Sequence, residues 1–276
     1  EPGMNKTNEY LFGVYPVLLA MRAGKRSFKT LWMQKRAGRA TLEKKDEKAR
    51  EEIKQHSLSM GLRMFWVQKR DSLDKLTGGR PHQGLVAYCS IRIPEEVEEL
   101  PPPAKGALWL VLEGVTDTMN LGSLLRSAAF FGVEGVICEK GCARYSPMAA
   151  KASAGAGEMI EVLQTNYLPA LVDRARRQGW LVAGTALPSG SPTEDPVYSS
   201  LEDWLPPPNQ LDDGVLLVLG REGPGLRQEV KSRCSRLVGI PRMGDNVDGL
   251  DSLNVGVAAG IALHSIRIAM GAQRPV

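Results

Sequence analysis

Three separated segments after about residue 100 contain the residue types that could do chemistry. The first runs from Glu113 to Arg126, the second from Gly220 to Leu226, and the third from Ile240 to Val255. Each begins at the end of a short apolar run that is typical of a buried strand. Ligands bind in the loops beyond the strands of a parallel sheet, so these segments form the candidate site.

The first segment has two interpretations. Asn120 could cap the helix that follows it, a position that asparagine favours, and Arg126 could be a surface ion-pair partner. Alternatively, the helix N-terminus and Arg126 together could bind a phosphate. The residue types alone favour the first interpretation.

The second segment has three glycines in six residues, which would let the backbone approach a ligand closely. Its order, G-x-x-G-x-G, is neither the dinucleotide fingerprint nor a P-loop, so a nicotinamide oxidoreductase is disfavoured. A simple tight turn with Glu222 exposed is the alternative.

In the third segment Asp251 or Ser252 could cap the last helix, although Ser252 and Asn254 alternate unusually with apolar residues.

Apolar runs alternate with amphipathic stretches, which predicts an α/β fold. In the first third we expect helices at about 10–23, 41–59 and 71–77, and strands at 28–33, 64–67 and 85–91. Further on we expect strands at 108–112, 135–138, 160–163, 180–184, 215–219 and 237–240, and helices at about 121–131, 147–155, 168–178 and 253–268. Continuous apolar strands indicate a parallel sheet covered on both faces. The polar stretch 187–213 is expected to be a long loop.

An acidic and then proline-rich segment, residues 93–106, is expected to be a linker between domains at 1–92 and 107–276. Residues 1–90 contain 18 lysines and arginines against 9 acidic residues, whereas residues 91–276 contain 17 against 22. A basic first domain favours a polyanionic partner, although a solvated basic helix would have the same composition.

The 276 residues are 43 % hydrophobic and 24 % charged, as in globular proteins. No apolar run approaches the ~20 residues of a membrane span, so no membrane partner is expected. The four cysteines are too few for a disulfide scaffold and lack zinc-site spacing, which favours a reducing compartment. Because the chain begins at Glu1, we expect a processed or trimmed form without its targeting segment.

Taken in order, the three segments resemble the motifs of the SpoU family of RNA 2′-O-ribose methyltransferases. The matching residues are Asn120, Gly122 and Arg126; Gly220, Glu222, Gly223, Gly225 and Leu226; and Ile240, Pro241 and Ser252 to Val255. The stretches Gly13–Leu18 and Leu73–Gly84 resemble the family's RNA-binding domain, so the resemblance covers about residues 10–268. The chain departs from the family's motif at two positions: Glu113 stands where the family usually has aspartate, and Thr118 where it usually has proline after Asp117. The longer loop Gly244–Gly249 resembles the mitochondrial branch, which modifies a guanosine of large-subunit ribosomal RNA.

The resemblance implies an S-adenosylmethionine-dependent homodimer of the SPOUT class. Its expected fold is a small N-terminal α/β RNA-binding domain followed by a parallel-sheet methyltransferase domain with a trefoil knot. The knot rests on the resemblance alone, because the general rule against knots argues otherwise. By resemblance the catalytic residues are Arg126, Asn120, Glu222, Ser252 and Asn254, and the cofactor-binding residues are Gly220, Ile240, Leu253 and Thr185. No metal is expected, because a sulfonium is already a good leaving group.

Arg126 is an awkward general base, since a guanidinium hardly deprotonates at neutral pH, and holding a phosphate or an oxyanion is the easier role. The expected RNA contacts in the first domain are Arg22, Lys25, Arg26 and Lys29. His82 is expected to be a turn residue rather than a base. The substrate expected by resemblance is ribosomal RNA in the mitochondrial matrix. Methylation of transfer RNA and a non-catalytic ribosome-assembly factor are the alternatives.

Overall fold

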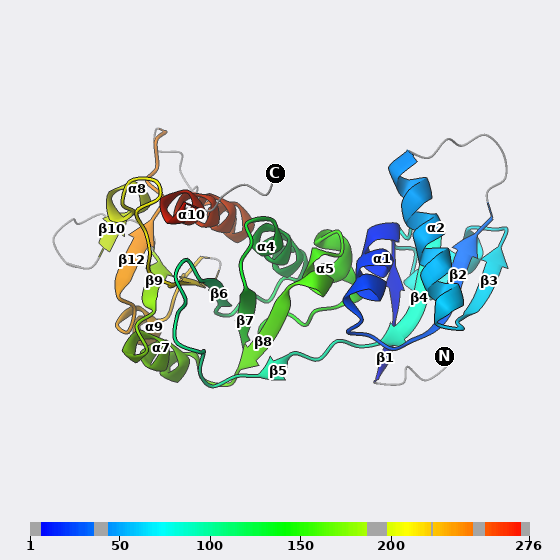
Figure 1. The fold of residues 1–276 in the computed structure, drawn as a ribbon, viewed down its shortest axis with the longest axis horizontal. Helices are drawn as coiled ribbons and strands as arrows, with labels where there is room; N and C mark the ends of the chain where they lie inside the picture. The colour runs from blue at the N-terminus through cyan, green and yellow to red at the C-terminus, as the bar shows by residue number, and fades with distance from the viewer. Residues whose placement is uncertain (1–6, 36–43, 187–197, 222, 245–251, 272–276) are drawn as a thin grey trace. The chain divides into compact units, whose positions relative to one another are not determined.

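The computed structural model describes residues 7–35, 44–186, 198–221, 223–244 and 252–271 (Figure 1). The chain forms two compact units. The first unit comprises Glu1–Ile93 and Arg144–Met159, and the second comprises Pro94–Ala143 and Ile160–Val276. The segment Arg144–Met159 therefore packs with the first third of the chain, which a linear division at residues 93–106 does not anticipate.

The first unit is built on a four-stranded sheet in the order β1-β4-β2-β3. Its strands are β1 (Asn8–Phe12), β2 (Phe28–Gln34), β3 (Arg63–Val67) and β4 (Leu85–Ser90). Strand β4 is antiparallel to both β1 and β2, and β3 is parallel to β2. Its helices are α1 (Val14–Ala23), α2 (Lys44–Ser59), α3 (Asp71–Thr77), α5 (Pro147–Ala152) and α6 (Ala156–Met159).

Two helix predictions in this unit need correction. Residues 10–12 belong to β1 rather than to a helix, because they pair with β4. Gly13 then turns the chain into α1 with φ 99°, a conformation that a side chain would strain. The helix predicted at 147–155 is interrupted by Ala154 and Gly155, which both have positive φ, and becomes α5 and α6.

The second unit is built on an eight-stranded sheet in the order β10-β12-β9-β11-β6-β7-β8-β5, with every pairing parallel. Its strands are β5 (Glu95–Glu96), β6 (Leu108–Leu112), β7 (Gly135–Glu139), β8 (Glu161–Thr165), β9 (Leu181–Thr185), β10 (Tyr198–Ser200), β11 (Val215–Leu219) and β12 (Arg236–Gly239). Strands β6 and β11 are buried along their whole length, as their unbroken apolar sequences predict.

Helices cover both faces of this sheet (Figure 1). They are α4 (Thr118–Phe130), α7 (Leu168–Arg177), α8 (Leu201–Trp204), α9 (Gln228–Lys231) and α10 (Val255–Met270). Helices α4 and α10 lie on one side, and α7 and α9 on the other, where Leu171, Val172 and Val230 join a core with Val111 and Val218. The predicted fold class is confirmed: a small α/β unit and a parallel sheet covered on both faces.

Several predicted boundaries shift. Of the predicted linker at 93–106, residues 94–106 belong to the second unit, because β5 pairs with β8 and Leu100 is buried in the core of that unit. The loop predicted at 187–213 contains β10 and α8, and residues 187–197 of it lie outside the described residues. All four cysteines are free thiols. Within the described ranges, no helix has both the length and the apolar character needed to cross a membrane.

Candidate functional site

The parallel strands bring the three predicted segments to one edge of the large sheet. Leu219 of β11 pairs with Leu112 of β6, and Thr185 of β9 pairs with Val238 of β12. Because β6, β11, β9 and β12 are neighbours that run in the same direction, their carboxyl ends lie side by side. The segments that begin at Glu113, Gly220 and Ile240 therefore leave the sheet at the same edge, as the sequence predicts.

The glycine-rich turn after β11 folds back tightly on itself. The backbones of Arg221 and Gly225 exchange two hydrogen bonds, of 3.2 and 3.0 Å. Gly220 is buried there, and a Cβ at this position would lie 2.2 Å from the backbone nitrogen of Leu226. Gly223 and Gly225 have φ of 82° and 69°. Glycine suits each of these positions. The turn closes on itself at Gly220, and the open space beside Gly223 and Gly225 leaves the backbone there accessible to a ligand. Glu222 lies outside the described residues.

Two predicted catalytic residues from distant motifs contact each other directly. The Nδ2 of Asn254 donates a hydrogen bond to Oδ1 of Asn120 over 3.1 Å. The Oδ1 of Asn254 accepts from the backbone N–H of Gly256 over 2.9 Å, so Asn254 is the N-cap of α10. One side chain thus starts a helix and joins the first motif to the third.

The structure corrects the expected helix caps. Helix α4 begins at Thr118, and its cap is Asp117, whose side chain accepts a hydrogen bond from the backbone N–H of Asn120 over 2.8 Å. The side chain of Asn120 is thereby left to bond Asn254 instead of its own helix. Ser252 is exposed and does not cap α10, and Asp251 lies outside the described residues.

Helices α4 and α10 approach closely beside this contact. A Cβ on Gly256 would lie 2.7 Å from Oγ of Ser123, so a side chain at position 256 would have to displace Ser123 where the two helices meet. Arg126 is exposed further along α4. Leu253, which precedes α10, leaves 49 % of its surface exposed although it is apolar. The side chains of Arg126 and Leu253 are therefore accessible from solvent.

The remaining predicted cofactor residues occupy neighbouring strand ends. Thr185 is the last residue of β9, is half-buried, and donates its hydroxyl to the carbonyl of Val218 over 3.3 Å. Ile240 directly follows β12 and is half-buried. Backbone groups, a hydroxyl and apolar side chains are a suitable set for an adenosine and an aliphatic chain. Within the described residues, no group of three or more His, Cys, Asp or Glu side chains could hold a metal.

An arginine that the sequence prediction missed ties the second segment to the sheet. The backbone N–H of Arg227 donates to Oε2 of Glu113 over 2.8 Å, and its Nε donates to Oε1 over 2.5 Å. Its Nη2 also bonds the carboxylate of Glu139 at the end of β7. The side chain of Glu113 is only 1 % exposed, whereas that of Arg227 is 38 % exposed. Arg227 thus neutralises a buried carboxylate and fixes the end of the glycine turn.

The electrostatics of this clamp follow from burial and pairing. Burial raises the pKa of Glu139, and the neighbouring Arg227 opposes that shift without reversing it. The hydrogen bond to Glu113 raises the pKa of the Arg227 guanidinium, which stays charged. The only sequence signal for this role is that Glu113 and Glu139 both lie at the ends of buried strands, and it does not identify the partner.

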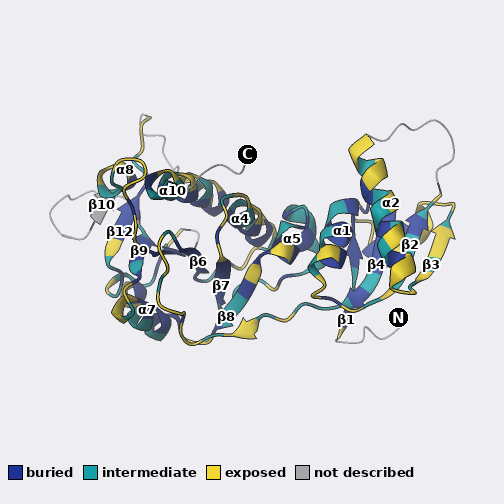
Figure 2. Ribbon diagram, viewed as in Figure 1, coloured by how far each residue is buried: buried dark blue, intermediate teal, exposed yellow. Residues whose placement is uncertain are grey.

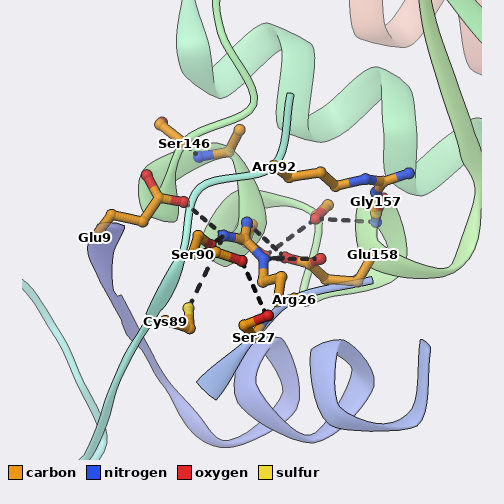
Figure 3. A network of polar contacts seen from close by, with 12 residues as sticks. Glu9, Arg26, Ser27, Cys89, Ser90, Arg92, Ser146, Gly157 and Glu158 are labelled. Atoms are coloured by element: carbon orange, nitrogen blue, oxygen red, sulfur yellow. Dashed lines mark hydrogen bonds and ion pairs between the residues drawn. The ribbon is translucent and has the colours of Figure 1, made fainter. Parts of the chain in front are cut away.

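In the first unit, one of the four predicted RNA contacts needs correction. The side chain of Arg26 is 0 % exposed and lies between two carboxylates (Figure 3). Its Nη1 donates to Oε1 of Glu9 and to the carbonyl of Ser90, each over 2.7 Å, and its Nε donates to Glu158 over 3.0 Å. Burial lowers the pKa of Arg26, but Glu158 and Glu9 outweigh that effect and raise it. Arg26 holds α6 to the sheet and is not accessible to RNA.

The other three predicted RNA contacts are at the surface. Arg22 forms two hydrogen bonds to Glu52, of 2.6 and 2.7 Å, and remains 46 % exposed. Lys25 and Lys29 are exposed. His82 is a structural residue, as expected: it is 1 % exposed, its Nε2 lies 3.1 Å from Asp74, and its Nδ1 accepts from the backbone of Gly84.

Comparison with known proteins identifies relatives over nearly the whole chain. The model of the SpoU rRNA Methylase family matches residues 107–264. The model described as RNA 2′-O ribose methyltransferase substrate binding matches residues 10–93. The human protein named rRNA methyltransferase 1, mitochondrial, is 39 % identical over 94 % of this chain and 72 % of its own length. The 23S rRNA (guanosine-2′-O-)-methyltransferase RlmB of Xanthomonas campestris is 34 % identical over 98 % of this chain and all of its own length.

Solved structures support the same fold. An AdoMet-bound rRNA methyltransferase from Sinorhizobium meliloti matches with a TM-score of 0.72 and 21 % identity, over 95 % of this chain and 87 % of that one. The SpoU methyltransferase AviRb from Streptomyces viridochromogenes, in complex with AdoMet, matches with a TM-score of 0.67 and 21 % identity, over 95 % and 89 %. Together with the family models, these similarities confirm the predicted resemblance. The chain belongs to the SpoU rRNA methylase family.

Proposed function

We propose that this protein transfers a methyl group from S-adenosylmethionine to the ribose 2′-hydroxyl of a guanosine in large-subunit ribosomal RNA. The observation that carries the proposal is the convergence of all three family segments at one sheet edge, where Asn254 bonds Asn120 over 3.1 Å. The names of the RlmB relatives specify 23S rRNA and the guanosine 2′-oxygen. The chain keeps both asparagines and Arg126, which favours the enzyme over a non-catalytic assembly factor.

The chain's own residues offer groups suited to binding the cofactor. The buried Gly220 keeps the turn after β11 tight, Gly223 and Gly225 leave open space beside its backbone for a ligand, and Ile240 and Leu253 offer apolar contacts. Thr185, the last residue of β9, adds a hydroxyl group at the same edge of the sheet. When bound, S-adenosylmethionine supplies a methyl group on a positively charged sulfur, which needs no metal to leave.

The remaining task of the protein is to align the ribose and manage its proton. The 2′-oxygen bonds to the methyl carbon as the carbon–sulfur bond breaks, and the hydroxyl proton passes to a base or to water. We assign Arg126 to the phosphate beside the reacting ribose and to the developing oxyanion, because a guanidinium binds anions better than it accepts protons. The hydrogen bond between Asn120 and Asn254 fixes the N-terminal ends of α4 and α10 relative to each other. We assign Ser252 and Glu222 to positioning the ribose.

The test is methyl transfer from labelled S-adenosylmethionine to large-subunit ribosomal RNA, with nucleosides identified by mass spectrometry. We expect 2′-O-methylguanosine from the wild-type protein and its loss in Arg126→Ala and Asn254→Ala. Leu58→Ala is a matched control, because Leu58 is a 59 % exposed residue of α2. Transfer to transfer RNA alone would contradict the substrate, and RNA binding without any transfer would favour the assembly factor.

We further propose that the first unit, which replaces the predicted domain at 1–92, binds the RNA and that the second unit, which replaces the predicted domain at 107–276, binds the cofactor. The basic composition of the first domain and its match to a substrate-binding model support this division. Lys25 and Lys29 are expected to contact phosphates, because both are exposed. Reversing both charges should weaken RNA binding and flatten its salt dependence, while S-adenosylmethionine binding stays unchanged.

A homodimer is part of the proposal. Val257, Ile261 and Ile268 of α10 are 51, 39 and 47 % exposed, and Phe130 at the end of α4 is 83 % exposed. Spacings of four and seven residues place the three α10 side chains on one helical face. An exposed apolar face of this kind fits a second copy of the chain. Val257→Glu should convert a dimer, measured by light scattering, into a monomer, and a wild-type monomer would contradict the assignment.

The mitochondrial matrix is the proposed location. Relatives from human, Dictyostelium discoideum and Schizosaccharomyces pombe are named mitochondrial, and the human one is 39 % identical. Immunodetection of the endogenous protein in protease-treated mitochondria, before and after lysis of the inner membrane, tests it. Protein that is digested before lysis would contradict the location.

A further inference from the structure

Aromatic side chains form two rows across one face of the small sheet. The pairing register places Phe12, Val86, Trp32 and Phe65 in one row, and Tyr10, Tyr88, Thr30 and Arg63 in the next. Successive strand residues point to opposite faces, so all eight side chains belong to the same face. The other face carries Leu31, Leu85 and Ala87, which are fully buried.

Four of these rings form a continuous series. The rings of Trp32 and Phe65 are stacked, with centroids 6.0 Å apart and an interplanar angle of 20°. The Tyr10 ring lies 6.0 Å from that of Trp32 and 4.9 Å from that of Tyr88. The series therefore spans the sheet from the edge strand β3 to the opposite edge strand β1, and we call Phe65, Trp32, Tyr10 and Tyr88 the aromatic platform.

The platform is only partly covered. Leu73 and Leu76 of α3 and Met148 of α5 pack around Phe12 and Val86, at one end of the face. Tyr10, Trp32 and Tyr88 remain half-buried, and Phe65 is 44 % exposed on a strand that is largely exposed (Figure 2). A core would normally bury such rings, because each carries a large apolar surface.

Cations border the platform. The Nζ of Lys29 lies 6.0 Å from the centroid of the Tyr88 ring, and Arg63 is exposed in the same row as Tyr88. Rings flanked by lysine and arginine suit bases joined by phosphates, because bases stack on the rings and phosphates pair with the cations. A protein partner would not require this pairing of ring and charge.

We propose that the aromatic platform binds unpaired nucleotides of the RNA substrate by base stacking, with Lys29 and Arg63 pairing to the phosphates between them. This inference rests on the proposed function, because it specifies how the first unit recognises RNA. The stack holds a single-stranded segment rather than a helix, since bases in a duplex present no free π-face. It depends little on base identity, because every base can stack.

The experiment compares binding of a fluorescent single-stranded RNA of about ten nucleotides with binding of a duplex of equal length. The full-length Phe65→Leu variant keeps an apolar side chain but removes the ring, and Phe65→Tyr restores a ring. We expect Phe65→Leu to weaken single-strand binding about tenfold, duplex binding to change less than about twofold, and Phe65→Tyr to bind as the wild type does. Trp66→Leu is the control, because Trp66 is 48 % exposed on the opposite face of β3.

Each outcome decides between stacking and its alternatives. Equal single-strand affinity of Phe65→Leu and wild type would overturn the proposal and leave this face to a protein partner. A tenfold loss in Trp66→Leu would overturn it as well, because the effect would not belong to the platform. The methyl-transfer assay on wild-type protein separates the two claims. If no methyl is transferred but Phe65→Leu still weakens single-strand binding, the proposed function fails and the platform stands.

Discussion

Replacing Arg227 by methionine tests the clamp that fixes the glycine-rich turn. The substitution keeps much of the aliphatic length but removes the charge that pairs with Glu113 and Glu139. Glu113 is 1 % exposed, so its carboxylate would be left buried without its cation. Breaking a buried pair by removing one partner typically costs about 3–5 kcal/mol. We expect a loss of unfolding free energy of that order, at the lower end because Arg227 itself is 38 % exposed.

The assay is urea denaturation followed by tryptophan fluorescence. Trp109 and Trp180 are both buried in the core of the second unit, so they report its unfolding. Arg174→Met is the matched control, because Arg174 pairs with Glu98 over 3.0 Å but Glu98 is 85 % exposed. Exposed pairs of this kind contribute about 1 kcal/mol or less.

A double-mutant cycle makes the test specific. Adding Glu113→Gln to Arg227→Met removes the buried charge, so the double variant should lose less stability than the sum of the two single variants. S-adenosylmethionine affinity should fall in Arg227→Met, because the turn at Gly220 loses its attachment. If Arg227→Met costs no more than Arg174→Met, the reasoning about the clamp is refuted.

Three further predictions address other parts of the chain. Gly220→Ala should weaken S-adenosylmethionine binding at least about tenfold in calorimetry, because its Cβ would lie 2.2 Å from a backbone nitrogen, and unchanged affinity would contradict the tight turn. Burial lowers the pKa of His82 more than Asp74 raises it, so the folded state binds fewer protons and stability should fall as the pH drops below about 6.5. That fall, at most about 1.4 kcal/mol per pH unit, should be absent from His82→Gln in denaturation curves at about pH 5.5 and 7.5. Burial raises the pKa of Cys89 and of Cys234 to about 12, so both thiols should react with iodoacetamide only after unfolding, and rapid native labelling by mass spectrometry would contradict this burial.

The large sheet was predictable because its strands are unbroken apolar runs. Residues 108–112 and 215–219 form strands with the predicted bounds. A strand that is buried on both faces is apolar at every position, so the apolar run in the sequence marks its full length. Strand β1 was not predictable in the same way. Its residues Asn8–Phe12 run directly into the helix that follows Gly13, so apolar residues on both sides of the turn look like one helical pattern.

The candidate site was predictable as a set of segments but not as a set of contacts. The family motifs include Asn120 and Asn254, yet only the fold shows that one bonds the other across 134 positions of sequence. Composition could not separate Arg26, which is buried in an ion-pair network, from the exposed Lys25 and Lys29 in the same basic stretch. Pairing of charges depends on long-range packing, and spacing along the chain does not record it.

The most direct test of the central claim is the position of the transferred methyl group on the nucleotide. Ribosomal RNA is labelled by the wild-type protein with radioactive S-adenosylmethionine and then hydrolysed in alkali. A 2′-O-methyl group removes the hydroxyl that alkaline cleavage needs, so we predict label in alkali-resistant dinucleotides that contain guanosine. Label in mononucleotides would place the methyl group on a base and contradict ribose methylation.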